Sequence, residues 1–175
     1  MKWFDKLFKK PSKARSLFPG ERLGIDKILT LKNSTEMIIE LSYGLSDKIH
    51  QKGYDSLSEP ERVLNRVYWL ESEINNGGFE QFFANSSGDY ALDTPAALDE
   101  IGAPHTARLV KRAIDIFPGG LPPRDMQQRI EKMNLIDEET VNQFENLTSE
   151  FLEYRDPLEE LQFKYMVANK DQIQV

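Results

Sequence analysis

The chain has 175 residues, of which 39% are hydrophobic, and carries a formal net charge of −7. This length and apolar content predict one globular domain with its own core and exclude an intrinsically disordered chain. Cysteine is absent, which excludes disulfides and thiolate chemistry. Because no apolar run approaches the roughly 18 residues of a spanning helix and no secretory signal follows the N-terminus, we expect a cytoplasmic protein.

Residues 1–20 are predicted to form a basic amphipathic arm and linker, ahead of one all-helical domain over residues 21–175. Residues 1–32 hold nine Lys or Arg against three Asp or Glu, whereas residues 33–175 hold thirteen against twenty-six. Residues 2–10 predict a short helix, and its apolar face consists of Trp3, Phe4, Leu7 and Phe8. Docking of this helix on the body is favoured over membrane contact, because about two and a half turns need tertiary support.

Helical periodicity and capping residues predict the next two helices. Ser34 caps a helix that continues to about His50. Ser58 begins the next helix, with Pro60 in its first turn and Glu61 at the capping-box position.

The remainder of the chain carries the same kind of signals. Further helices are predicted at 94–102, 104–117 and 124–133, after Asp137, and after Pro157. No segment alternates with period two between hairpin turns. The sequence therefore predicts an all-α fold, a compact single domain of about seven to nine helices with a short amphipathic N-terminal helix.

The most distinctive segment is the run from Asn75 to Asp89, NNGGFEQFFANSSGD. Asn and Gly reach positive φ at little cost and Ser bonds nearby backbone, so the run predicts a helix stop, a short buried helix and a second stop. We interpret its signature residues as structural: Asn75, Asn76, Gly77, Gly78, Phe79, Phe82, Phe83, Asn85, Ser86 and Gly88. The alternative is that its polar residues line a pocket.

This run resembles the signature of the DNA-mimic-protein-like family, which comprises small acidic bacterial all-helical proteins. The resemblance continues through Asp99–Pro104 and Phe117–Asp125 and covers about residues 34–165. The well-described member of that family is an acidic dimer that occupies the DNA-binding surface of a transcription factor. The resemblance therefore implies that acidic residues of this chain bind a basic protein.

Two acidic segments are the candidate partner-binding surfaces. Residues 137–160 contain nine acids and one basic residue, Arg155. As a helix of about 36 Å they would carry about one net charge per 4.5 Å, against about 3.4 Å per phosphate along a DNA strand. The candidate residues are Asp137, Glu138, Glu139, Glu145, Glu150, Glu153, Asp156, Glu159 and Glu160, with Asp89, Asp93, Asp99 and Glu100 from the second segment. An ordinary solvated helix face is the alternative interpretation.

No recognisable catalytic, nucleotide-binding or metal-binding motif is present. The two histidines, His50 and His105, fall on different predicted helices, so we expect no metal site and no cofactor. The leading hypothesis is a non-enzymatic module that binds a basic protein such as a transcription factor, with no direct nucleic-acid contact and with a homodimer as an option. The alternatives are an immunity-type inhibitor of a basic toxin, and an enzyme or small-ligand binder with a pocket near residues 75–89.

Overall fold

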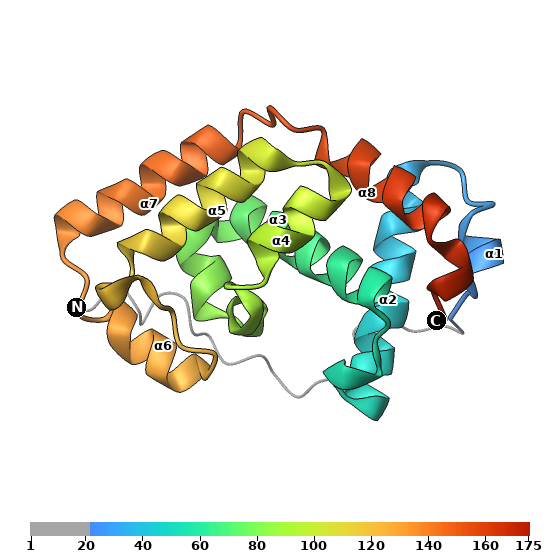
Figure 1. Cartoon of the computed structure of the whole chain (residues 1–175), viewed down its shortest axis with the longest axis horizontal. Helices are drawn as coiled ribbons and strands as arrows, with labels where there is room; N and C mark the ends of the chain where they lie inside the picture. Colours follow the sequence, from blue (N-terminus) through green and yellow to red (C-terminus); the bar gives the residue numbers. More distant parts are fainter. Residues whose placement is uncertain (1–21) are drawn as a thin grey trace.

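A computed structural model describes residues 22–175, which fold into eight α-helices with no strand among them (Figure 1). The prediction of an all-α fold is confirmed. The arm predicted over residues 1–20, with its apolar face of Trp3, Phe4, Leu7 and Phe8, lies outside the described residues.

The long helix α3 is the centre of the fold, and it contacts α2, α4, α6, α7 and α8 (Figure 1). The helices are α1 (Ile25–Ile28), α2 (Ser34–Lys52), α3 (Glu59–Ala84), α4 (Thr94–Ile101), α5 (Pro104–Ile116), α6 (Met126–Met133), α7 (Glu138–Phe151) and α8 (Leu158–Ala168). Short 3-10 turns lie between or after them: η2 (Tyr54–Ser56), η3 (Ser86–Tyr90), η4 (Pro118–Gly120) and η5 (Lys170–Gln172).

The predicted N-capping residue is correct at α3, and at α2 it is one position too far along the chain. At α3 the capping box is complete: Glu61 N donates to the Ser58 hydroxyl, and Ser58 N donates to the Glu61 carboxylate at 2.7 Å. At α2 the cap is Asn33, whose side chain accepts from Glu36 N at 2.8 Å. The prediction of Ser34 as the cap is therefore wrong, and its hydroxyl instead donates to Glu159 of α8.

The first stop predicted within the signature is a break inside α3. Asn75 and Asn76 keep helical geometry, whereas Gly77 and Gly78 leave it, with Gly78 at φ 75°. A side chain is strained at this φ, and a Cβ on Gly78 would also lie 2.9 Å from the Thr148 hydroxyl of α7. The glycines thus let α3 change direction against α7.

The apolar side chains form two clusters on either side of the first half of α3. The larger cluster joins α3, α4, α5 and α7 and contains the three signature phenylalanines, of which none is more than 1% exposed. The smaller cluster joins α1, α2 and α8 to Leu64 of α3. Tyr165 packs against both clusters, so they form one continuous body.

Candidate functional site

The acidic segment 137–160 occupies α7, the first turn of α8 and the connection between them. Helix α7 packs along α5 and α3 (Figure 1), and its Phe144, Leu147 and Phe151 are buried there. Most of the nine acids are exposed, as the apolar periodicity predicts, but Glu150 and Asp156 are half-buried.

The C-terminal part of this segment is largely paired within the protein. Glu150 bonds to Arg112 of α5 at 2.7 Å, and this contact holds the pKa of its carboxyl below the ordinary value. Glu153 pairs with Arg155 and Glu160 with Lys164.

Asp156 and Glu159 are also used internally, as acceptors for uncharged donors. Asp156 accepts from the backbone N–H of Thr106 at 2.7 Å and from its hydroxyl at 2.9 Å, which satisfies a free N–H in the first turn of α5. Glu159 accepts from the hydroxyls of Ser34 and Thr35, which lower its pKa. Asp156 therefore connects the segment before α8 to α5, and Glu159 connects α8 to α2.

Four acids in the N-terminal half of the segment have no ion pair among the described residues. Asp137 caps α7 by accepting from Thr140 N at 2.8 Å, and hydrogen bonds to Thr140 lower its pKa. Glu138, Glu139 and Glu145 are exposed and accept no hydrogen bond within the described part of the chain. Uncompensated negative charge is thus concentrated on the first two turns of α7.

The four acids of the second acidic segment, residues 89–100, all have partners within the chain. Asp93 pairs with Arg124 at 2.8 Å and Asp99 with Lys111 at 3.2 Å. Glu100 accepts from the Tyr165 hydroxyl of α8. Asp89 forms the most buried of these pairs, with Arg129. The basic partners of these acids lie outside residues 89–100, so the local sequence does not reveal the ion pairs.

Arg129 of α6 is fully buried and anchors the turn that ends the signature. Its Nε donates to Phe83 O at 2.6 Å. Its Nη2 donates to Asn85 O at 2.8 Å and to the Asp89 carboxylate at 2.7 Å. Its Nη1 donates to the carbonyls of Pro123 and Arg124 at 2.7 and 2.8 Å. Five acceptors therefore use one guanidinium, which fixes η3 and the loop before α6.

The sequence reasoning did not identify Arg129. A charged residue in a short polar helix is ordinarily exposed. One signal was available in Gly88, because a Cβ there would lie 2.8 Å from Arg129 Nε and 2.8 Å from Phe82 O. A glycine in a turn of this kind indicates close approach of another group, but it does not identify the group.

The other signature residues connect helices. Asn75 donates to Glu71 O and to the Tyr154 hydroxyl, which in turn donates to the Glu71 carboxylate at 3.0 Å. Burial raises the pKa of Glu71, and the hydrogen bonds that its carboxylate accepts from Tyr154 and Gln162 oppose the rise. Asn85 and Gln81 both donate to Glu73 Oε2, at 2.8 and 2.6 Å. Asn75, Gln81 and Asn85 therefore use their amide groups in hydrogen bonds within the fold.

A pocket of about 330 Å³ nevertheless opens beside the end of the signature. Its walls come from the second half of α2, from η2, from the first half of α3 and from η3, including Ser86 and Ser87. A second hollow of about 220 Å³ lies where α2, α3 and α8 meet, at Glu71 and Gln162. In that hollow the amide of Gln162 already donates to Glu71 at 2.8 Å.

Glu80 has a carboxyl group whose pKa lies well above the ordinary value. Burial, with the nearby charge of Glu145, raises its pKa to about 7, and its Oε1 is buried without a partner. A carboxyl with a raised pKa binds protons in the folded state that the unfolded state has released. Burial of Glu80 therefore costs little stability near pH 4, where the carboxyl is protonated. The free energy of unfolding falls as the pH rises through 7, because the buried carboxyl then becomes charged.

We expect Glu80→Gln to raise the free energy of unfolding by about 1–2 kcal/mol at pH 8 and to change it by less than about 0.5 kcal/mol at pH 4.5. Glutamine removes the charge that is costly above pH 7 and resembles the protonated carboxyl below it. Urea unfolding at both pH values measures the difference. The control is Glu145→Gln, which removes the nearby charge but leaves the Glu80 carboxyl buried, so we expect a smaller effect. Equal stabilisation by Glu80→Gln at both pH values would contradict the assignment.

No group of three or more His, Asp or Glu side chains within residues 22–175 is arranged to hold a metal ion. No helix in this part of the chain combines the length and apolarity that crossing a membrane requires.

Comparison with known proteins identifies a family for this chain. A family model described as DMP19-like protein matches residues 55–169, which include the whole signature and the whole of the acidic segment 137–160. No curated protein and no solved structure matches the chain.

Proposed function

Because the chain belongs to the DMP19-like protein family, we propose that it is a non-enzymatic, cytoplasmic DNA mimic. In this proposal an acidic surface occupies the nucleic-acid-binding surface of a basic partner, such as a transcription factor. The partner contacts carboxylates where its own Lys and Arg side chains otherwise contact phosphates.

The uncompensated charge on α7 is the observation that supports this proposal. Asp137, Glu138, Glu139 and Glu145 lie within about two and a half turns of one helix and have no intramolecular counter-ion among the described residues. The acids of residues 89–100 and the C-terminal part of the segment already have partners. We therefore restrict the proposed contact surface, defined here as the α7 acidic face, to these four residues.

The test compares two variants that lose the same charge. Glu138→Gln, Glu139→Gln and Glu145→Gln together remove three uncompensated carboxylates, which are exposed and contribute little to folding. At about 0.5 kcal/mol each, their loss weakens binding of a co-purified basic partner by roughly tenfold at low salt. The measurement is titration of the purified pair at several salt concentrations, with duplex DNA as competitor.

The matched control is Asp99→Asn, Glu153→Gln and Glu160→Gln, which removes three carboxylates that are already paired. The control keeps most of the affinity. Binding that is insensitive to salt, that DNA does not displace, or that both variants weaken equally would contradict the proposal.

A further inference from the structure

The turn between α6 and α7 places exposed apolar surface beside the uncompensated acids of α7. Leu135 lies in this turn and is 78% exposed, the largest exposed fraction of any large hydrophobic residue in the described part of the chain. Asp137, Glu138 and Glu139 follow within four positions and are also exposed. These four residues, together with Leu121, are defined here as the α6–α7 corner.

Leu121 and Leu135 both lie at the end of α6, where each backbone bonds to Lys132. The ammonium of Lys132 donates to Leu121 O at 3.3 Å, and Leu135 N donates to Lys132 O at 3.1 Å. Ile136 packs against the larger apolar cluster, and its N–H donates to Met133 O at 3.1 Å, so the turn is held from within. Leu121 is 61% exposed. One exposed leucine is ordinary, but two beside three uncompensated carboxylates form a surface that is both apolar and acidic.

The complementary chemistry is present in residues 1–21 of the same chain, which lie outside the described part. These residues hold six Lys or Arg against two Asp or Glu, whereas residues 22–175 hold sixteen against twenty-seven. The helix predicted over residues 2–10 combines an apolar face with four lysines: Trp3, Phe4, Leu7 and Phe8, with Lys2, Lys6, Lys9 and Lys10. Such a helix matches a surface that offers both exposed leucines and unpaired carboxylates.

The length of the segment before α1 allows contact within one molecule. Arg22 is held on α2 by an ion pair with Asp47 at 2.6 Å, and α6 and the start of α7 lie at the other end of the molecule from α1 (Figure 1). Residues 11–21 extend to about 38 Å and a helix over residues 2–10 adds about 13 Å, against a diameter of about 40 Å for a domain of this size. The tether gives an effective concentration of the order of 1 mM, so weak intrinsic affinity is sufficient for docking.

We propose that residues 2–10 form an amphipathic helix that docks on the α6–α7 corner of the same molecule. Its apolar face contacts Leu121 and Leu135, and its lysines pair with Asp137, Glu138 and Glu139. The docked helix covers three of the four residues of the α7 acidic face, so a basic partner has to displace it before binding there. The contact forms in the isolated protein and is therefore independent of the proposed binding of a partner.

The experiment uses the full-length protein and paramagnetic NMR. The chain has no cysteine, so Ser12→Cys provides a single attachment point for a nitroxide spin label directly after the docked helix. In isotope-labelled protein the oxidised label broadens the amide signals of Leu135 and Glu138, and reduction of the label restores them. Leu135→Ser weakens docking by about tenfold and lowers the broadening of the Glu138 signal several-fold. Because Leu135 is exposed, this variant keeps the stability of the native protein.

Leu152→Ser is the matched control and leaves the broadening unchanged, because Leu152 is also exposed but lies at the opposite end of α7. A mixture of spin-labelled protein without isotope and isotope-labelled protein without the spin label detects contact between copies, and we expect no broadening in it. The proposal is overturned if the spin label does not broaden the signals of the α6–α7 corner, or if the broadening arises between copies. Equal effects of Leu135→Ser and Leu152→Ser also overturn it.

Discussion

Arg129→Met is expected to lower the free energy of unfolding by about 3–5 kcal/mol. The variant removes all five donors of a side chain with no exposed surface and leaves four backbone carbonyls and the Asp89 carboxylate without that partner. Urea unfolding followed by circular dichroism measures the loss. Its magnitude is a large part of the roughly 5–15 kcal/mol that stabilises a typical domain.

The matched control is Arg112→Met, which removes another arginine paired with a carboxylate. The side chain of Arg112 is 57% exposed and its pair with Glu150 is screened by solvent, so we expect a loss below about 1 kcal/mol. Arg129→Lys should behave like Arg129→Met, since one ammonium group cannot reach acceptors on both η3 and the loop before α6. A loss below about 1 kcal/mol for Arg129→Met would show that solvent replaces the guanidinium.

Predictions that depended on local chemistry agree with the structure. The capping box of Ser58 and Glu61 involves residues three apart, and its two hydrogen bonds form within one turn. Gly102 ends α4 in the left-handed conformation, and Pro104 begins α5. Each signal is read within a few residues, so no knowledge of the tertiary arrangement is needed.

The positions of charges could not be predicted in the same way. A count of acids in residues 89–100 indicates a negative surface, but Asp89 and Asp93 meet arginines that come 40 and 31 residues later. Such pairs depend on how α6 packs against η3. The same limit applies to residues 137–160, which the sequence predicts to be one acidic surface, although only the first half of α7 retains uncompensated charge.

The pocket of about 330 Å³ beside the end of the signature shows a related limit. Tyr54 and Tyr90 are 36 positions apart and belong to different 3-10 turns, and neither turn has a strong periodic signal. The pocket predicted near residues 75–89 as an alternative is therefore close to the observed one. Its main walls, however, come from α2, η2 and the first half of α3.

Phe83→Ala is expected to lower the free energy of unfolding by about 3–5 kcal/mol. Phe83 has no exposed surface, and its ring lies 4.7 to 6.5 Å from the rings of Phe79, Phe82, Phe117 and Phe144. Alanine leaves a cavity among four aromatic side chains that the surrounding helices cannot close. Thermal and urea unfolding of the variant measure the loss.

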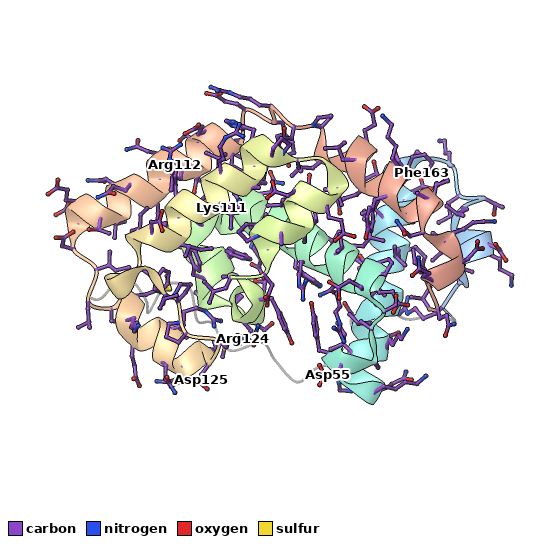
Figure 2. The ribbon with its side chains drawn as sticks, in the orientation of Figure 1. Asp55, Lys111, Arg112, Arg124, Asp125 and Phe163 are labelled. Carbon is purple, nitrogen blue, oxygen red and sulfur yellow. The ribbon has the colours of Figure 1, made fainter. Side chains whose placement is uncertain are left out.

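Phe163→Ala is the matched control, because this ring is only half-buried against the smaller apolar cluster at the side of α8 (Figure 2). We expect it to cost about 1–2 kcal/mol, in proportion to the smaller area it buries. The comparison also separates two interpretations of the signature. If the role of Phe83 is to stabilise the fold, the Phe83→Ala variant binds its partner less only because a smaller fraction of the protein is folded. A variant that remains as stable as the native protein and loses the partner would instead assign this phenylalanine to the contact surface.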